Sequence, residues 1–82
     1  MTYKLKDHVT DEMLVAVGFR QPAYDKNEMN RKVNNTTVII LNKETRNIYG
    51  KKFIFVELDV KLIPVFPYIQ DLIELGYVEE IK

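Results

Sequence analysis

The chain has 82 residues, of which 46% are apolar, with a formal net charge of zero and no cysteine. This length fits one domain over residues 1–82, and the absence of cysteine excludes a disulfide framework and a thiolate metal site. The longest apolar run, residues 38–41, is far below the ~20 residues that a membrane span needs, and residues 1–7 lack the apolar core of a secretory signal. We therefore expect a cytoplasmic protein without membrane contact, stabilised by apolar burial.

Basic and acidic residues are unevenly divided along the chain. Residues 20–52 carry eight lysines and arginines against three acidic residues, whereas residues 53–82 carry two lysines against six acidic residues. The two halves can attract each other in the folded protein, or the basic half can present a face to an acidic partner. The composition leaves both interpretations open.

The first predicted element is a short helix over residues 10–17. Thr10 is a favourable N-cap, and the two acidic residues that follow it suit the positive end of the helix dipole. Gly18 is expected to end the helix at positive φ, with Phe19 folding back onto Leu14 as in a Schellman motif. A helix of about two turns is not stable alone, so we expect it to pack on a sheet.

The middle of the chain is predicted to form antiparallel strands, because β-branched residues are frequent there and apolar residues alternate with polar ones. Asn34 and Asn35 tolerate the positive φ of a hairpin turn, and Gly50 with Lys51 indicates another turn. The expected strands are residues 29–33, 36–41, 46–49 and 53–60, with a polar turn at 42–45.

A second helix is predicted near the end of the sequence. Apolar residues recur at helical spacing over residues 68–75, two prolines suit the entry, and Gly76 with Tyr77 repeats the glycine–aromatic ending of the first helix. The predicted fold class is therefore α+β. It consists of an antiparallel sheet of three to four strands packed by an N-terminal and a C-terminal helix.

Three segments together carry a family resemblance: residues 3–14 with the following Gly18-Phe19, residues 41–49, and residues 68–79. Their pattern resembles small uncharacterised proteins encoded by phages and prophages of Gram-positive bacteria. The resemblance implies an accessory phage gene product in the cytoplasm of a bacterial host cell. It brings no catalytic residue to this chain.

Residues suited to catalysis are scarce. The chain has no serine, no cysteine and one histidine, so it lacks a nucleophile–base pair. His8 lies near Asp7, Asp11 and Glu12, but acidic residues at a helix start are explained by capping and by the helix dipole rather than by metal binding. The three glycines suit turns and caps and form no phosphate loop. We predict no enzymatic activity, no cofactor and no metal site.

Basic residues around the predicted turns suggest one binding function. Lysines and arginines interleaved with an aromatic residue suit contact with single-stranded nucleic acid through phosphates and base stacking. The candidate residues are Lys43, Arg46, Tyr49, Lys51 and Lys52. The near-neutral isoelectric point and the acidic Glu44 within the group oppose this interpretation.

A surplus of apolar residues suggests the other binding function, which we predict as the main one. Two short helices cannot cover all the large apolar side chains between residues 53 and 68, and an uncovered apolar patch usually marks an interface. The candidate interface residues are Phe53, Phe55, Ile63, Val65, Phe66 and Tyr68. The expected partner is another protein of host or phage, or a second copy of the chain in a dimer.

Overall fold

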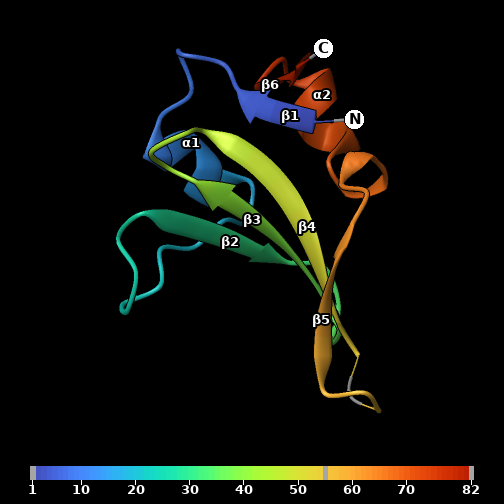
Figure 1. The fold of residues 1–82 in the computed structure, drawn as a ribbon. Helices are drawn as coiled ribbons and strands as arrows, with labels where there is room; N and C mark the ends of the chain where they lie inside the picture. The colour runs from blue at the N-terminus through green and yellow to red at the C-terminus, as the bar shows by residue number, and fades with distance from the viewer. Residues whose placement is uncertain (1, 55, 82) are drawn as a thin grey trace.

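The computed structural model describes residues 2–54 and 56–81. These residues form a six-stranded antiparallel sheet with two short α-helices and one 3-10 turn (Figure 1). The elements are β1 (Thr2–Leu5), α1 (Asp11–Ala16), β2 (Glu28–Lys32), β3 (Thr37–Asn42), β4 (Asn47–Ile54), β5 (Asp59–Ile63), η1 (Phe66–Tyr68), α2 (Gln70–Glu74) and β6 (Val78–Ile81). The predicted α+β class is wrong: this is a small, mostly-β domain.

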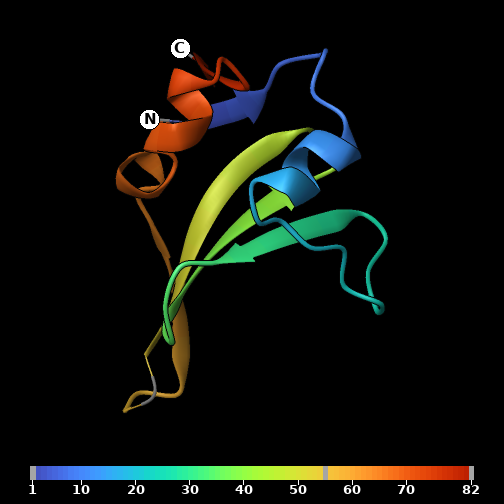
Figure 2. The same ribbon diagram turned by 180° about the vertical axis from the view of Figure 1, so that it is seen from behind.

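Strand β4 organises the sheet. The strand order is β2-β3-β4-β1-β6, and β5 also pairs with β4. Strand β3 occupies one edge of β4, while the other edge pairs with β1 at its start and with β5 at its end. The hairpin of β4 and β5 extends away from both helices (Figures 1 and 2).

The prediction missed the two strands that flank the helices in the chain. Strands β1 and β6 are each four residues long and pair with each other, with Leu5 opposite Val78. Each is too short to show a clear alternation of apolar and polar residues. Pairing between segments more than seventy residues apart leaves no local pattern, and this pairing makes the fold mostly β.

The predicted turn at Gly50 and Lys51 is also wrong, because β4 runs through both residues. Gly50 lies between Ile39 on β3 and Ile63 on β5, and an added Cβ would lie 3.0 Å from Cγ1 of Ile63. The glycine therefore permits close strand packing here. The turn occurs instead after Ile54, at residues 56–58, and divides the single strand predicted over residues 53–60.

The start of α1 and the C-terminal ends of both helices follow the predicted capping chemistry. The Thr10 side chain accepts a hydrogen bond from the Met13 amide, which caps the start of α1. The Phe19 amide donates to the Leu14 carbonyl at 3.0 Å and Gly18 has φ of +100°, so the Schellman motif is confirmed. The same motif ends α2 at Gly76. Helix α2 begins only at Gln70, because the preceding turn is 3-10.

The turn between β2 and β3 is confirmed at Asn34, although its mechanism differs from the prediction. The Asn34 side chain accepts hydrogen bonds from the amides of Thr36 and Thr37, each at 2.9 Å. Positive φ occurs instead at Arg46 and Leu58 among the described non-glycine residues. The side-chain amide of Asn34, rather than a left-handed backbone, therefore shapes this turn.

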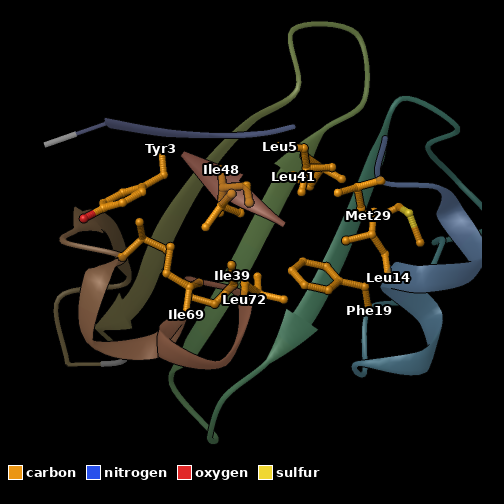
Figure 3. Close-up of a cluster of buried hydrophobic side chains, with 13 residues drawn as sticks. Tyr3, Leu5, Leu14, Phe19, Met29, Ile39, Leu41, Ile48, Ile69 and Leu72 are labelled. Atoms are coloured by element: carbon orange, nitrogen blue, oxygen red, sulfur yellow. The ribbon is translucent and has the colours of Figure 1, made fainter. Parts of the chain in front are cut away.

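The core lies between one face of the sheet and the two helices (Figure 3). Ile39, Leu41 and Ile48 contribute the centre of the sheet, while Leu14 and Leu72 come from α1 and α2. All five side chains are buried. We call this side of the sheet the helix face. The two helices cover its β1, β2 and β3 strands and the first half of β4.

Arg31 joins the helices to the sheet edge. Its guanidinium donates to both carboxylate oxygens of Asp71 at 2.8 and 3.2 Å, to the Tyr68 carbonyl at 2.6 Å and to the Val17 carbonyl at 3.2 Å. It also lies over the Phe19 ring, 5.2 Å from the centroid. One basic residue of the middle segment is thus paired with the acidic C-terminal segment, as the attraction between the two halves predicts.

Candidate protein interface

The predicted apolar interface is not one surface. Val65 is buried, and Tyr68 packs against the core. Ile63 lies on the helix face of the sheet, where it contacts Gly50. Phe53 and Phe66 keep substantial exposure, and Phe66 stacks against Tyr3 with ring centroids 6.2 Å apart. Phe55 lies outside the described residues.

The large exposed apolar side chains gather instead on the β4–β5 hairpin. Val56 is 97% exposed, Leu58 92% and Leu62 73%. Phe53 and Val60, which lie directly opposite each other in the β4–β5 pair, are also exposed. We call these five residues the hairpin patch. Exposed apolar side chains gathered on one small element are a frequent feature of interaction surfaces.

Beside this patch, the outer edge of β5 presents main-chain groups that pair with no other described strand; of these, the Val60 amide donates only to the adjacent Asp59 carboxylate, at 2.8 Å. The Phe53 amide donates to the Thr36 carbonyl, so the N–H and C=O of Phe53 point toward β3. Its opposite residue, Val60, is then in a non-hydrogen-bonded pair, and its own N–H and C=O point away from β4. Leu62, two residues further along β5, has the same orientation. Among the described residues no strand pairs with this edge.

Charges alternate with the apolar residues along β5. Asp59 and Lys61 lie on the side of the strand opposite to Val60 and Leu62. Lys61 stands directly opposite Lys52 on β4, and like charges at such positions repel. Its nearest carboxylate is that of Glu57 at 3.8 Å, a loose and exposed ion pair. The edge thus carries a positive charge that the hairpin compensates poorly.

The sheet face turned away from the helices, the open face, holds a groove of about 570 Å³. Its apolar lining includes Val38, Ile40, Phe53 and Val60, so the groove is continuous with the hairpin patch. Lys32 and Lys51 also line it, as do Asp25 and Glu28. The groove therefore combines apolar residues with both signs of charge.

The five predicted nucleic-acid contacts are separated by the fold. Lys43 donates to the Asp11 carboxylate at 2.7 Å and to the Gln21 side chain at 3.0 Å. Arg46 donates to the carbonyls of Lys6 and Val9 at 2.7 and 3.1 Å, which ties the turn before β4 to the segment after β1. Both cations are thus engaged within the protein.

The remaining three contacts lie on opposite sheet faces. Lys51 and Tyr49 share the open face, where the Lys51 ammonium lies 5.5 Å from the ring centroid of Tyr49. Lys52 points to the other side of the strand. The pKa of Tyr49 is raised, first by burial and then by the carboxylates of Glu28 and Asp25. Negative charge next to Tyr49 opposes phosphate binding.

The described residues carry no group of three or more histidine, cysteine, aspartate or glutamate side chains able to hold a metal ion. No helix within those residues is long and apolar enough to cross a membrane. No protein family, curated protein or solved structure was found to match this chain.

Sequence reasoning missed most of the hairpin patch because it placed residues 53–60 in one strand, either buried on both faces or with one face against a partner, and did not expect the turn at residues 56–58. A signal was present: Val56, Leu58, Val60 and Leu62 recur at every second position, interleaved with charged residues. That alternation is typical of a strand with one solvated face. Which face would be covered depended on the position of the helices.

Proposed function

We propose that the protein is a binding module without catalytic activity that takes up an extended segment of another polypeptide along the outer edge of β5. The observation that carries this proposal is the coincidence of outward-directed main-chain groups at Val60 and Leu62, which pair with no described strand, with exposed apolar side chains on the same strand. Strand addition of this kind takes its affinity from main-chain hydrogen bonds and its specificity from alternate side chains.

The hairpin carries some of the features that protect edge strands from pairing, namely Lys61 on β5 and Pro64 after it, but the open face of β5 is apolar. Natural edges are commonly shortened, covered, or given charges that point inward. Strand β5 has five residues, and its exposed face carries valine and leucine. Pro64, which ends the strand, removes one N–H donor from its end only. An edge of this composition is suited to pairing.

Two further parts of the proposal extend the sequence interpretation. An accessory role among phage proteins of Gram-positive hosts fits a small binding module, and we propose the host cytoplasm as its location. The absence of cysteine is compatible with a reducing compartment. Both parts depend on the resemblance of the sequence and not on the hairpin.

Selection from a random peptide display library tests the main proposal. We expect the protein to enrich peptides in which apolar residues alternate, because an added strand turns every second side chain toward the open face. A synthetic peptide from the selection should bind the Leu58→Ser/Leu62→Ser variant at least about tenfold more weakly, since two apolar contacts are lost.

Val15→Ser is the matched control, because Val15 is exposed on α1, away from the hairpin. This variant should bind the peptide with unchanged affinity. A library that yields no binder, or a peptide that binds the hairpin variant as tightly as the original protein, would contradict the proposal.

Single-stranded nucleic acid is a second candidate ligand, favoured by the pairing of Lys51 with Tyr49 on the open face and by Lys32 in the groove. A fluorescence-anisotropy titration with random single-stranded DNA at two salt concentrations tests it. Lys51→Glu should abolish a salt-sensitive interaction, whereas Lys52→Glu, on the opposite sheet face, should have little effect. Equal losses in the two variants would exclude a site on the open face.

A further inference from the structure

We infer that the partner of the β5 edge is a second copy of this chain, paired antiparallel with Val60 opposite the same valine of the other copy. This inference rests on the proposed function and names the segment that the edge takes up. It would join two sheets through their β5 strands into one continuous sheet.

The main-chain geometry restricts the possible registers. Val60 and Leu62 direct their N–H and C=O groups outward, so hydrogen-bonded pairs across the new interface must join residues of this set. The residues that direct their main-chain groups toward β4 stand opposite one another in the intervening pairs. Four symmetric registers are then available, centred on Asp59, Val60, Lys61 or Leu62.

Charge and proline chemistry select one of the four. Centring on Asp59 or on Lys61 places two identical charges directly opposite each other, which is unfavourable. Centring on Leu62 places Val60 opposite Pro64, which has no N–H to donate. Centring on Val60 places Asp59 opposite Lys61 on both sides of the symmetry axis, so two cross-strand pairs of opposite charge form.

The same register gives a favourable partner to two groups that lack a good one among the described residues of the isolated hairpin, the Lys61 ammonium and the Val60 amide. Lys61, which faces Lys52 within the chain, gains the carboxylate of Asp59 from the other copy. The Val60 amide, which donates to the Asp59 carboxylate at 2.8 Å, would donate instead to the carbonyl of the opposite valine. That exchange releases the Asp59 side chain for the cross-strand pair.

Pairing would also cover part of the hairpin patch and leave the groove accessible. Val60 of one copy would lie against Val60 of the other, and Leu62 would approach Leu58 of the other copy across the interface. Because the symmetry axis is perpendicular to the joined sheet, both open faces lie on the same side. The two grooves would then form one extended surface.

A charge-exchange experiment tests the register by sedimentation velocity over a range of protein concentrations. The original protein should form a concentration-dependent dimer. Asp59→Lys and Lys61→Asp should each weaken it by about tenfold or more, because each substitution places like charges opposite each other twice. An equimolar mixture of the two variants should restore the dimer, because each substituted position then faces its opposite charge.

Two further variants separate edge pairing from other modes of association. Val60→Pro removes an N–H that points away from β4, so the hairpin should persist while the dimer is lost. Lys26→Asp, an equal charge change in the exposed loop before β2, should leave the dimer unchanged. Circular dichroism melting curves should show that each variant is folded.

Three results would overturn the inference. These are a monomeric protein at millimolar concentration, a dimer that both single charge variants leave unchanged, and a mixture that does not restore association. If the protein is monomeric but a selected peptide binds the β5 edge, self-pairing is wrong and the proposed function stands. If neither association nor peptide binding occurs, both proposals are wrong.

Discussion

The two halves of strand β4 differ sharply in their surroundings. Ile48, near its start, is buried between the sheet and the helices, whereas Phe53, near its end, is exposed on the hairpin. Both residues are large and apolar, and both belong to one continuous strand. The difference arises because the two side chains lie on opposite faces of β4: Ile48 lies on the helix face, which α1 and α2 cover, whereas Phe53 lies on the open face. The hairpin end of β4 also extends away from both helices (Figures 1 and 2).

This comparison shows that the burial of an apolar side chain in this domain depends on which face of the sheet it lies on and on whether a helix covers that face, not on how apolar it is. We call the covered region the body. There, apolar side chains from the sheet and the helices pack against one another. Arg31 and Arg46 donate hydrogen bonds to backbone carbonyls of the body. In the hairpin, Leu62 lies on the open face and Leu58 lies in the turn, so no helix covers either side chain and both contact solvent. We expect the body to supply most of the stability, and we propose that the hairpin supplies a surface for binding.

Truncating one leucine in each region should give the largest difference in the free energy of unfolding. Leu72→Ala should lower the free energy of unfolding by about 3 kcal/mol, because Leu72 is fully buried and its loss leaves a cavity. Leu58→Ala should change it by less than about 0.5 kcal/mol, since Leu58 is 92% exposed. Urea denaturation of dilute protein measures both. Similar losses in the two variants would mean that the hairpin belongs to the folding core.

Replacing Arg31 should cause the next largest loss of stability. Arg31→Ala should destabilise the protein by about 2 kcal/mol or more, because it leaves the carbonyls of Val17 and Tyr68 without their donor and removes the ion pair to Asp71. Lys32→Ala, at the next position but on the open face, should have almost no effect on stability. Urea midpoints of the two variants provide the comparison, and a small shift for Arg31→Ala would show that the body does not depend on this link.

Gly18→Val should cost about 1 kcal/mol or more, because a β-branched residue is strained at φ of +100°. The added side chain would also start 3.3 Å from Cδ of Arg31. Gly76→Val is the control: Gly76 has φ of +76°, but no atom lies within 4 Å of the added Cβ. Thermal denaturation should rank Gly18→Val as the more damaging change; the reverse order would show that crowding at Arg31 is unimportant.

Lowering the pH should remove the stabilisation that the Asp71 carboxylate provides, which is the smallest of the predicted effects. Burial alone would raise the pKa of Asp71, but hydrogen bonds and charge from Arg31 outweigh it and hold this pKa below the ordinary value of 3.8. The resulting stability is present above pH 3.8 and is lost as pH falls through the lowered pKa. It should amount to less than about 1 kcal/mol, because the carboxylate is half exposed.

The measurement is the difference in urea midpoint between the original protein and Asp71→Asn as a function of pH. The difference should be constant near neutral pH and shrink below pH 3.8. A difference that persists at pH 2 would mean that the Asp71 charge contributes nothing and that another property of the side chain stabilises the body.

Local chemistry alone determined the caps and one turn of this protein. Thr10, Gly18 and Gly76 act within a few residues of their own position, so their roles could be predicted without knowing the rest of the structure. Asn34 also acts locally, through side-chain bonds to amides two and three residues away, but the sequence predicted only the place of its turn and not this mechanism. Such contacts depend on sequence neighbours and are already specified in a short segment.

Tertiary structure decided the fold class and which apolar side chains stay exposed. Strands β1 and β6 exist because they pair with each other across the length of the chain, and Gly50 lies within β4, paired with Ile39 on one side and Ile63 on the other. Arg46 has a structural role because its guanidinium donates to the carbonyls of Lys6 and Val9, which lie 40 and 37 positions away in the sequence. Long-range pairing and cover by helices leave no trace in local alternation, which explains why Val65 is buried while Leu58, equally apolar in the sequence, faces solvent.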